Sequence, residues 1–196
     1  MNIGLYFGSF NPIHYGHLII ANHILNTGIA DEIWFVVSPQ NPFKNTAGLL
    51  NQNHRLNMVK LAIDGEPKMK ASNIEFKLPL PSYTINTLTY LQEKSPSQKF
   101  LIVMGSDGFQ NLHKWKNAEA IIANYAVIIY KRPGFEITQT HGANITVVDA
   151  PLLEISSTHI RKLIKEKKSI RFLLPDIVKE EIEKNNYYKS TLENPA

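Results

Sequence analysis

The stretch that decides the fold is "NIGLYFGSFNPIHYGH", residues 2–17. Residues 2–7 form a short, almost wholly apolar run, which is typical of a strand covered on both faces. The chain then leaves this strand through two glycines, a proline and two histidines, and a helix begins near Gly16. We therefore predict a strand, a glycine-containing turn and a helix at the start of the chain.

Strands and helices are predicted to alternate along the rest of the chain. Apolar runs predict strands at 32–38, 70–76, 100–105, 125–130 and 144–149, and helical spacing predicts helices at 17–27, 51–63, 82–93, 117–123, 158–167 and 176–185. This alternation predicts an α/β fold with a Rossmann-like open, mainly parallel sheet and helices on both faces. Sheets of this kind bind ligands outside the carboxyl ends of their strands.

Length and composition are those of an ordinary globular protein. At 196 residues, 43% of them hydrophobic and 19% charged, the chain is expected to form one domain. We place this domain at residues 1–190, including the C-terminal helices, with a flexible tail at 187–196. No run approaches the ~20 apolar residues of a membrane span, and the N-terminus lacks the features of a signal peptide, so no membrane partner is expected.

Net charge and cysteine content restrict the kinds of site and partner that this protein can have. The absence of cysteine excludes disulfides, thiolate metal sites and a cysteine nucleophile, and it favours a reducing, cytoplasmic location. The net charge of +4 agrees with phosphate-bearing ligands but is too small to indicate a nucleic-acid partner. The sequence leaves the oligomeric state open, including a homo-oligomer.

The turn at residues 8–17 has the residues of a phosphate site. Gly8 and Ser9 lead to a helix N-terminus, whose free N–H groups and partial positive charge attract anions. Cationic side chains are disfavoured there by about 0.3–1 kcal/mol at an exposed site. Placing His14 and His17 at this position makes sense if they share a highly charged anion.

Other interpretations of the two histidines stay open at this point. They could be structural, or they could bind a metal ion, although no third ligand stands at a usable spacing. The stretch does not match GxGxxG, so the dinucleotide fingerprint of dehydrogenases is absent.

A second unusual stretch, "ISSTHIR" at 155–161, also opens a helix. Ser156, Ser157 and Thr158 can cap its amides or donate their hydroxyls. Arg161 lies in or near the first turn, where the helix dipole disfavours a cation. Two such helix starts, far apart in the chain, suggest one polyphosphate held between them, because local rules tend to break at functional sites.

These two stretches carry a family resemblance. "GSFNPIHYGH" resembles the G-x-F-x-P-x-H-x-G-H signature of the nucleotidyltransferase superfamily, and "ISSTHIR" resembles its second signature, S-S/T-T-x-I-R. The first signature is related to the HIGH motif of class I aminoacyl-tRNA synthetases. The chain is too short for a synthetase, and "KMK" at 68–70 lies too early for a KMSKS loop.

Within that superfamily, the sequence resembles the bacterial nicotinate-nucleotide adenylyltransferases over residues 1–190. The matching segments are "SPQNPFK" at 38–44, "HRLNMVKLAI" at 54–63, "SYTINTLTYL" at 82–91, "MGSDGFQNLHKWK" at 104–116 and "KRPG" at 131–134. Two positions depart from the family pattern, since Asn11 and Asn86 stand where aspartate is common. Neither is assigned to the chemistry.

The resemblance implies a fold of the HUP/nucleotidyltransferase type and a set of site residues. The residues implied for catalysis are His14, His17 and Arg161; those for ATP are Gly8, Ser9, Phe10, Gly105, Asp107, Ser157 and Thr158; those for nicotinate mononucleotide are Lys44, Thr84, Trp115 and Lys116. The side chains fit these roles. Trp115 offers a flat face for a pyridine ring, and Thr84, two residues past the expected N-cap Ser82, lies where helix amides could take a carboxylate.

Each of these residues also has an ordinary structural explanation. Trp115 could pack in the core, Thr84 could be a plain first-turn threonine, Lys44 a solvated loop lysine and Gly105 a turn glycine.

The resemblance implies adenylyl transfer from ATP to nicotinate mononucleotide, with release of pyrophosphate. We expect Mg²⁺ to arrive with ATP, because no dedicated carboxylate cage and no protein metal site are apparent. The alternatives are a pantetheine-phosphate adenylyltransferase, an FMN adenylyltransferase or cytidylyltransferase, and a nucleotide-binding sensor without catalysis. A nucleic-acid-binding protein is the weakest alternative. The preference for the acid or amide mononucleotide and the closure of loop 39–50 over substrate stay open.

Overall fold

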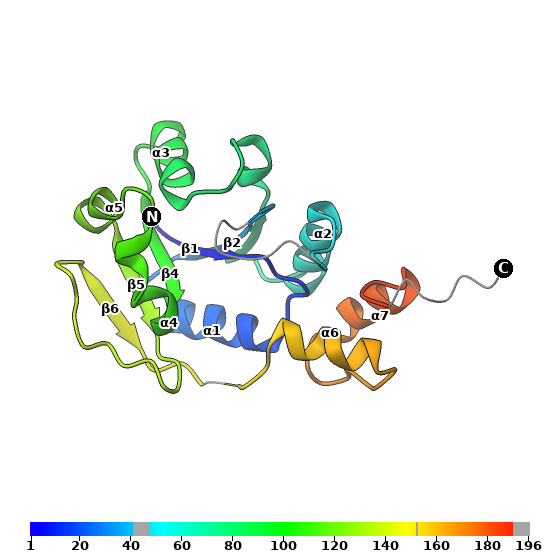
Figure 1. Cartoon of the computed structure of the whole chain (residues 1–196). Coiled ribbons are helices and arrows are strands. Elements are labelled where there is room, and N and C mark those ends of the chain that lie inside the picture. The colour runs from blue at the N-terminus through cyan, green and yellow to red at the C-terminus, as the bar shows by residue number, and fades with distance from the viewer. Residues whose placement is uncertain (41–47, 152, 190–196) are drawn as a thin grey trace.

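A computed structural model describes residues 1–40, 48–151 and 153–189 (Figure 1). Its centre is one six-stranded sheet in the order β3-β2-β1-β4-β5-β6, in which every neighbouring pair is parallel. The strands are β1 (Asn2–Gly8), β2 (Glu32–Val37), β3 (Met69–Ser72), β4 (Lys99–Gly105), β5 (Ala126–Tyr130) and β6 (Ile145–Val148). The predicted α/β fold with a parallel sheet is confirmed.

Helices cover both faces of this sheet (Figure 1). They are α1 (Tyr15–Asn26), α2 (Gln52–Ala62), α3 (Thr84–Lys94), α4 (Ser106–Phe109), α5 (Ala118–Asn124), α6 (Ser157–Lys165) and α7 (Asp176–Lys184), with 3₁₀ turns η1 (Ile74–Lys77) and η2 (Leu112–Lys114). Residues of α1, α2, α6 and α7 share one apolar cluster on one face, while α3 and α5 contribute to a second cluster on the other. No described helix is long and apolar enough to cross a membrane.

The central strands are apolar because both of their faces are covered. Phe35 and Val36 are consecutive on β2 and both 0% exposed, yet they belong to opposite clusters. Successive side chains of a strand point to opposite faces, so a strand buried on both sides cannot alternate with polar residues.

The strand order creates a crevice at one edge of the sheet. The chain runs outward from β1 to β2 and β3, then returns to β4 beside β1 and continues outward on the other side. In such sheets the ligand site lies outside the carboxyl ends of the strands where the order reverses. These ends are Gly8 of β1 and Gly105 of β4, two of the glycines assigned to ATP.

The structure corrects the predicted strand at 70–76. β3 ends at Ser72, which pairs with Val36, and a 3₁₀ turn at Ile74–Lys77 follows. Since β2 itself ends at Val37, residues beyond Ser72 have almost no neighbouring strand to pair with.

The structure also corrects two further predictions, the N-cap of α3 and the inclusion of Tyr187 in a flexible tail. Ser82 is not the N-cap, because the helix begins only at Thr84, after the N-cap Tyr83. The Ser82 N–H instead donates to the Gln40 carbonyl at 3.0 Å. Tyr187 does not belong to a loose tail: it is 9% exposed and its hydroxyl lies 2.8 Å from Nδ1 of His54.

Candidate active site

A cavity of about 580 Å³ opens at the carboxyl ends of β1 and β4. Its volume is typical of small-molecule sites. Within the described part of the chain, every residue predicted for the site lines it: Gly8, Ser9, Phe10, His14, His17, Thr84, Gly105, Asp107, Trp115, Lys116, Ser157, Thr158 and Arg161. Lys44 lies outside the described residues. Tertiary structure thus brings together segments from both ends of the chain.

The turn after β1 is shaped by Phe10. Its backbone has φ of 43°, in the left-handed region, and its ring folds back over Gly8. A Cβ on Gly8 would come within 2.7 Å of that ring, which is why a glycine stands there. The Phe10 side chain is only 2% exposed and packs edge-on against His17, with ring centroids 5.1 Å apart. Phe10 therefore supports the histidine that follows it.

The two histidines occupy different places at the start of α1. His14 is the N-cap, in extended conformation, and His17 is the third helical residue. Only His17 therefore lies in the first turn. The backbone N–H of His14 donates to Nδ1 of His17 at 3.3 Å, which requires a lone pair on Nδ1 and leaves Nε2 as the proton-bearing nitrogen.

His14 is buried and neutral at physiological pH. Its side chain is 5% exposed, and its Nδ1 has no hydrogen-bond partner among the described residues. Burial, followed by the nearby positive charge of Arg132, lowers the pKa of His14 from 6.5 to about 4. A neutral His14 escapes the unfavourable interaction with the helix dipole that a cation would have.

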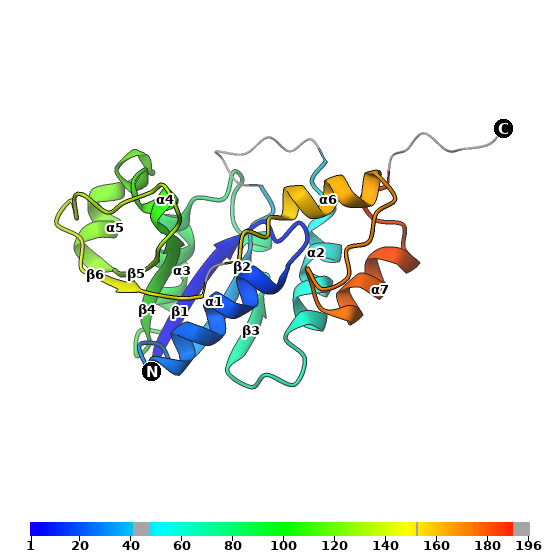
Figure 2. The ribbon, with the colours of Figure 1, turned by 90° about the horizontal axis from the view of Figure 1, so that it is seen from below.

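The second motif packs directly on the first (Figure 2). Ser156 is the N-cap of α6 and accepts a hydrogen bond from the His159 N–H at 3.1 Å, as a capping serine should. Ser157 donates its hydroxyl to the Pro12 carbonyl at 2.8 Å, and Arg161 donates Nη1 to the Asn11 carbonyl at 2.7 Å. The segments at 8–17 and 155–161, which were predicted to hold a polyphosphate, therefore form one wall of the cavity.

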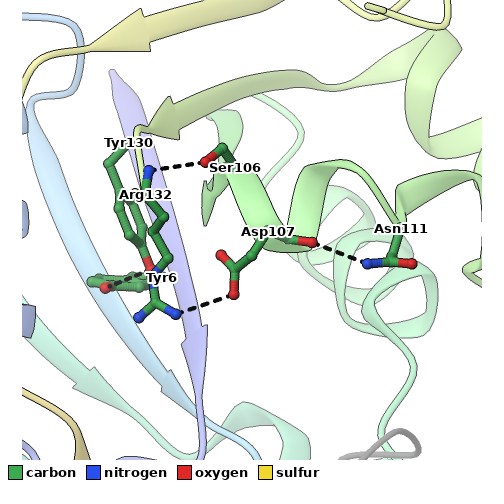
Figure 3. Close-up of polar contacts among 6 residues, drawn as sticks. All are labelled: Tyr6, Ser106, Asp107, Asn111, Tyr130 and Arg132. Atoms are coloured by element: carbon green, nitrogen blue, oxygen red, sulfur yellow. Dashed lines mark hydrogen bonds and ion pairs between the residues drawn. The ribbon is translucent and has the colours of Figure 1, made fainter. Parts of the chain in front are cut away.

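A second arginine, Arg132 of the "KRPG" segment, lines the same cavity, and no site role was predicted for it. Nη1 of Arg132 lies 3.1 Å from Oδ2 of Asp107, and its backbone N–H donates to Oγ of Ser106 at 2.9 Å (Figure 3). Arg132 also stacks over Tyr130, whose hydroxyl meets that of Tyr6 at 3.3 Å. The available signal was its position just beyond β5, at the carboxyl edge of the sheet.

Gly105 provides space at the end of β4. A Cβ built there would overlap Oδ1 of Asp107 and lie 3.1 Å from the Tyr130 ring. The glycine thus lets Asp107 fold back toward the strand and reach Arg132.

The far side of the cavity collects the residues predicted for the pyridine ring. Thr84 is the first residue of α3, and the N-cap Tyr83 makes no side-chain capping bond. Nζ of Lys116 lies 4.5 Å from the centre of the Tyr83 ring, which joins the segment of Trp115 to the start of α3. The half-buried indole of Trp115 thus lies in the same cavity as the start of α3, whose backbone N–H groups donate no capping bond to the side chain of Tyr83.

Glu75 also lines this side and was not predicted. It is 2% exposed, and Thr87 donates its hydroxyl to Oε1 at 3.0 Å. Burial raises the pKa of Glu75, against the opposing effect of the hydroxyls of Ser38, Thr87 and Ser82. A buried acid inside a segment expected to be a strand gave no separate sequence signal.

Comparisons with known proteins identify relatives of the chain. A family model described as cytidylyltransferase-like matches residues 5–163. "Probable nicotinate-nucleotide adenylyltransferase" of Flavobacterium psychrophilum is 50% identical, covering 96% of this chain and 100% of that protein. The protein of the same name from Christiangramia forsetii is 52% identical, over 95% of this chain and 98% of its own length.

A solved structure also resembles the whole chain. It is the Plasmodium falciparum nicotinic acid mononucleotide adenylyltransferase complexed with NaAD, which superposes with a TM-score of 0.84 at 26% identity and covers 98% of this chain and 99% of its own. The two converging motifs, the cavity between them and relatives about half identical over nearly the whole length lead to one conclusion: the chain belongs to the nicotinate-nucleotide adenylyltransferases, within the cytidylyltransferase-like family.

Proposed function

We propose that this protein transfers the adenylyl group of ATP to nicotinate mononucleotide, giving nicotinate adenine dinucleotide and pyrophosphate in NAD biosynthesis. The observation that carries the proposal is the convergence of the segments at 8–17 and 155–161 on one cavity whose opposite side holds Thr84 and Trp115. One end of this cavity offers cations and hydroxyls to phosphates, and the other offers an aromatic face to a pyridine ring.

ATP would lie along the carboxyl ends of β1 and β4. Gly8, Ser9, Phe10, Gly105 and Asp107 are assigned to its adenosine and α-phosphate side. His14 and His17 would contact the phosphates, and Arg161, Ser157 and Thr158 would hold the leaving pyrophosphate. We add Arg132 to this group, because it lines the same cavity and its charge already acts on His14.

Nicotinate mononucleotide would enter from the α3 side. Its pyridine ring would stack on Trp115, and its carboxylate would meet the free amides at Thr84, with Lys116 nearby. Lys44 is assigned to its phosphate by family resemblance alone.

The reaction needs little acid–base chemistry. An oxygen of the mononucleotide phosphate, already ionised at pH 7, attacks the α-phosphorus of ATP in line. The bond from that phosphorus to the bridging oxygen breaks, and its electron pair leaves with pyrophosphate. The protein positions the two phosphates and stabilises the growing negative charge.

Mg²⁺ would enter as part of the ATP substrate. Among the described residues, no group of three or more histidines, cysteines or carboxylates is placed to hold a metal ion. The phosphates themselves would carry the ion, and the cations of the cavity would complete charge neutralisation. We further propose that residues 1–190 act as one domain, in the cytoplasm, on these nucleotides.

The direct test is pyrophosphate release with ATP and Mg²⁺ in the presence of one acceptor at a time. Nicotinate mononucleotide should support the fastest release, and nicotinamide mononucleotide and phosphopantetheine should be much slower. Trp115→Phe, which keeps an aromatic face, should retain more activity with nicotinate mononucleotide than Trp115→Ala. A preference for phosphopantetheine would overturn the acceptor assignment, and no release despite ATP binding would favour a nucleotide sensor.

A further inference from the structure

The largest fully buried side chain of the described residues belongs to a charged residue outside the cavity, Arg55 of α2. It is 0% exposed, and no carboxylate in residues 1–40, 48–151 or 153–189 forms an ion pair with it. Burial lowers the pKa of Arg55 to about 10, so the guanidinium stays charged at neutral pH. A buried charge without a counter-charge is costly, so its retention needs a reason.

The hydrogen bonds of Arg55 supply that reason. Nη1 donates to the carbonyls of Ser9 and of Ser38, the latter at 2.9 Å, and Nη2 donates to the Pro39 carbonyl at 3.3 Å. Nε donates to the Leu50 carbonyl at 2.8 Å. One planar group thus joins the turn after β1, the turn after β2 and the segment that leads into α2.

The three segments joined by Arg55 all border the cavity. Ser9, Ser38 and Leu49 all line it. A second tie runs between two of the same segments: the Leu50 N–H donates to Oδ1 of Asn11 at 3.2 Å, and Nδ2 of Asn11 donates to the Gly48 carbonyl at 3.1 Å. The Asn11 carbonyl in turn accepts the bond from Arg161, so displacement of these turns would also displace the phosphate side of the site.

We infer that Arg55 is a positioning residue, which fixes the turns after β1 and β2 relative to each other so that both substrates are held in line. The inference deepens the proposed function and rests on it for its kinetic consequences. A lysine at this position would keep the charge but could not reach four carbonyls in the planar arrangement of a guanidinium. Packing alone does not explain Arg55, because an apolar side chain would fill the volume without burying a charge.

The test compares Arg55→Lys with Met58→Ala. Met58 lies on the same helix, is 0% exposed and does not line the cavity, so its truncation loosens the core without removing a described side-chain hydrogen bond to the turns. Arg55→Met, which removes the charge, is a third variant. Because Arg55→Met risks failing to fold, the decision rests on Arg55→Lys.

The kcat of Arg55→Lys and of Met58→Ala is measured well below their unfolding temperatures and is expressed per folded molecule. Arg55→Lys should lower kcat about ten- to hundredfold, the effect of misplacing reacting groups by about 1 Å, while Met58→Ala keeps the wild-type kcat. Amide exchange at Ser38 and Leu50 should accelerate in Arg55→Lys relative to amides of β4, and this ratio should be unchanged in Met58→Ala.

Unchanged kcat together with unchanged exchange in Arg55→Lys would overturn the inference. If the wild-type protein itself releases no pyrophosphate, the proposed function fails, and the exchange ratio alone then decides whether Arg55 fixes the turns.

Discussion

The imidazole rings of His14 and His17 stack on each other, with their centroids 3.7 Å apart and their planes 28° from parallel. Two cationic rings at this separation would repel each other strongly in a buried site. The stack is therefore suited to a neutral His14 ring, in agreement with the lowered pKa of His14. A polyphosphate would change this balance, because a nearby negative charge favours the protonated form of histidine.

His17→Ala should reduce turnover by at least about a hundredfold, because it removes a donor to the phosphates in the transition state. The measurement is kcat for pyrophosphate release from ATP with nicotinate mononucleotide.

The matched control for this variant is His23→Ala, in the last turn of the same helix and outside the cavity. It should retain nearly full turnover. A His17→Ala enzyme with near-normal kcat would remove His17 from the mechanism.

Arg132→Met should lower kcat/KM for ATP and should also raise the pKa of His14. Loss of a charge-assisted phosphate contact should lower kcat/KM for ATP about ten- to a hundredfold. Because the charge of Arg132 helps to lower the pKa of His14, its removal should raise that pKa, which an NMR titration of the histidine ring measures.

Arg171→Met is the control, since Arg171 is exposed and does not line the cavity. It should leave both quantities unchanged. An unaltered His14 titration in Arg132→Met would contradict the electrostatic coupling described above.

His14 should make the stability of the fold depend on pH between 6.5 and about 4. The folded state resists protonation of this ring, so the unfolded state binds more protons as the pH falls through this window. The associated stability is present above pH 6.5 and is lost toward pH 4, by about 3 kcal/mol.

Urea unfolding of the wild type and of His14→Asn at several pH values checks this expectation. The variant should lose less stability on acidification than the wild type. Parallel curves for the two proteins would show that His14 titrates normally in the folded state.

Glu75 should have the opposite effect on the pH dependence of stability. Because burial raises the pKa of Glu75 in the folded protein, its stabilising contribution is complete below its ordinary pKa of 4.5 and is lost as the pH rises through the raised value. Glu75→Gln keeps the size and an acceptor for Thr87 but cannot ionise.

The free energy of unfolding of Glu75→Gln should therefore decline less between pH 4.5 and neutrality than that of the wild type. Glu66→Gln, an exposed glutamate on another segment, should leave the wild-type profile unchanged. A Glu75→Gln profile that matches the wild type would mean that the folded protein does not raise the pKa of Glu75.

The sequence carried most of the information about the elements and the two motifs. Runs such as residues 100–105 are apolar at every position because both faces of a central strand are covered, and that pattern is local. The strand predicted at 70–76 is present, but its predicted end was wrong, because the end depends on where the neighbouring strand β2 ends, which no local pattern records.

By itself, then, the sequence determined an α/β chain with residues suited to phosphate at two helix starts, and the resemblance of its motifs to known signatures related it to one family. Tertiary structure decided that the two helix starts pack against each other and that Arg132 pairs with Asp107 at the same cavity. It also decided that Arg55 joins the turns after β1 and β2. The physical reason is the sequence separation of the residues that interact. Strand and helix patterns arise from neighbours a few residues apart, whereas the environment of a buried charge depends on segments far apart in the chain, such as Asn11 and Arg161.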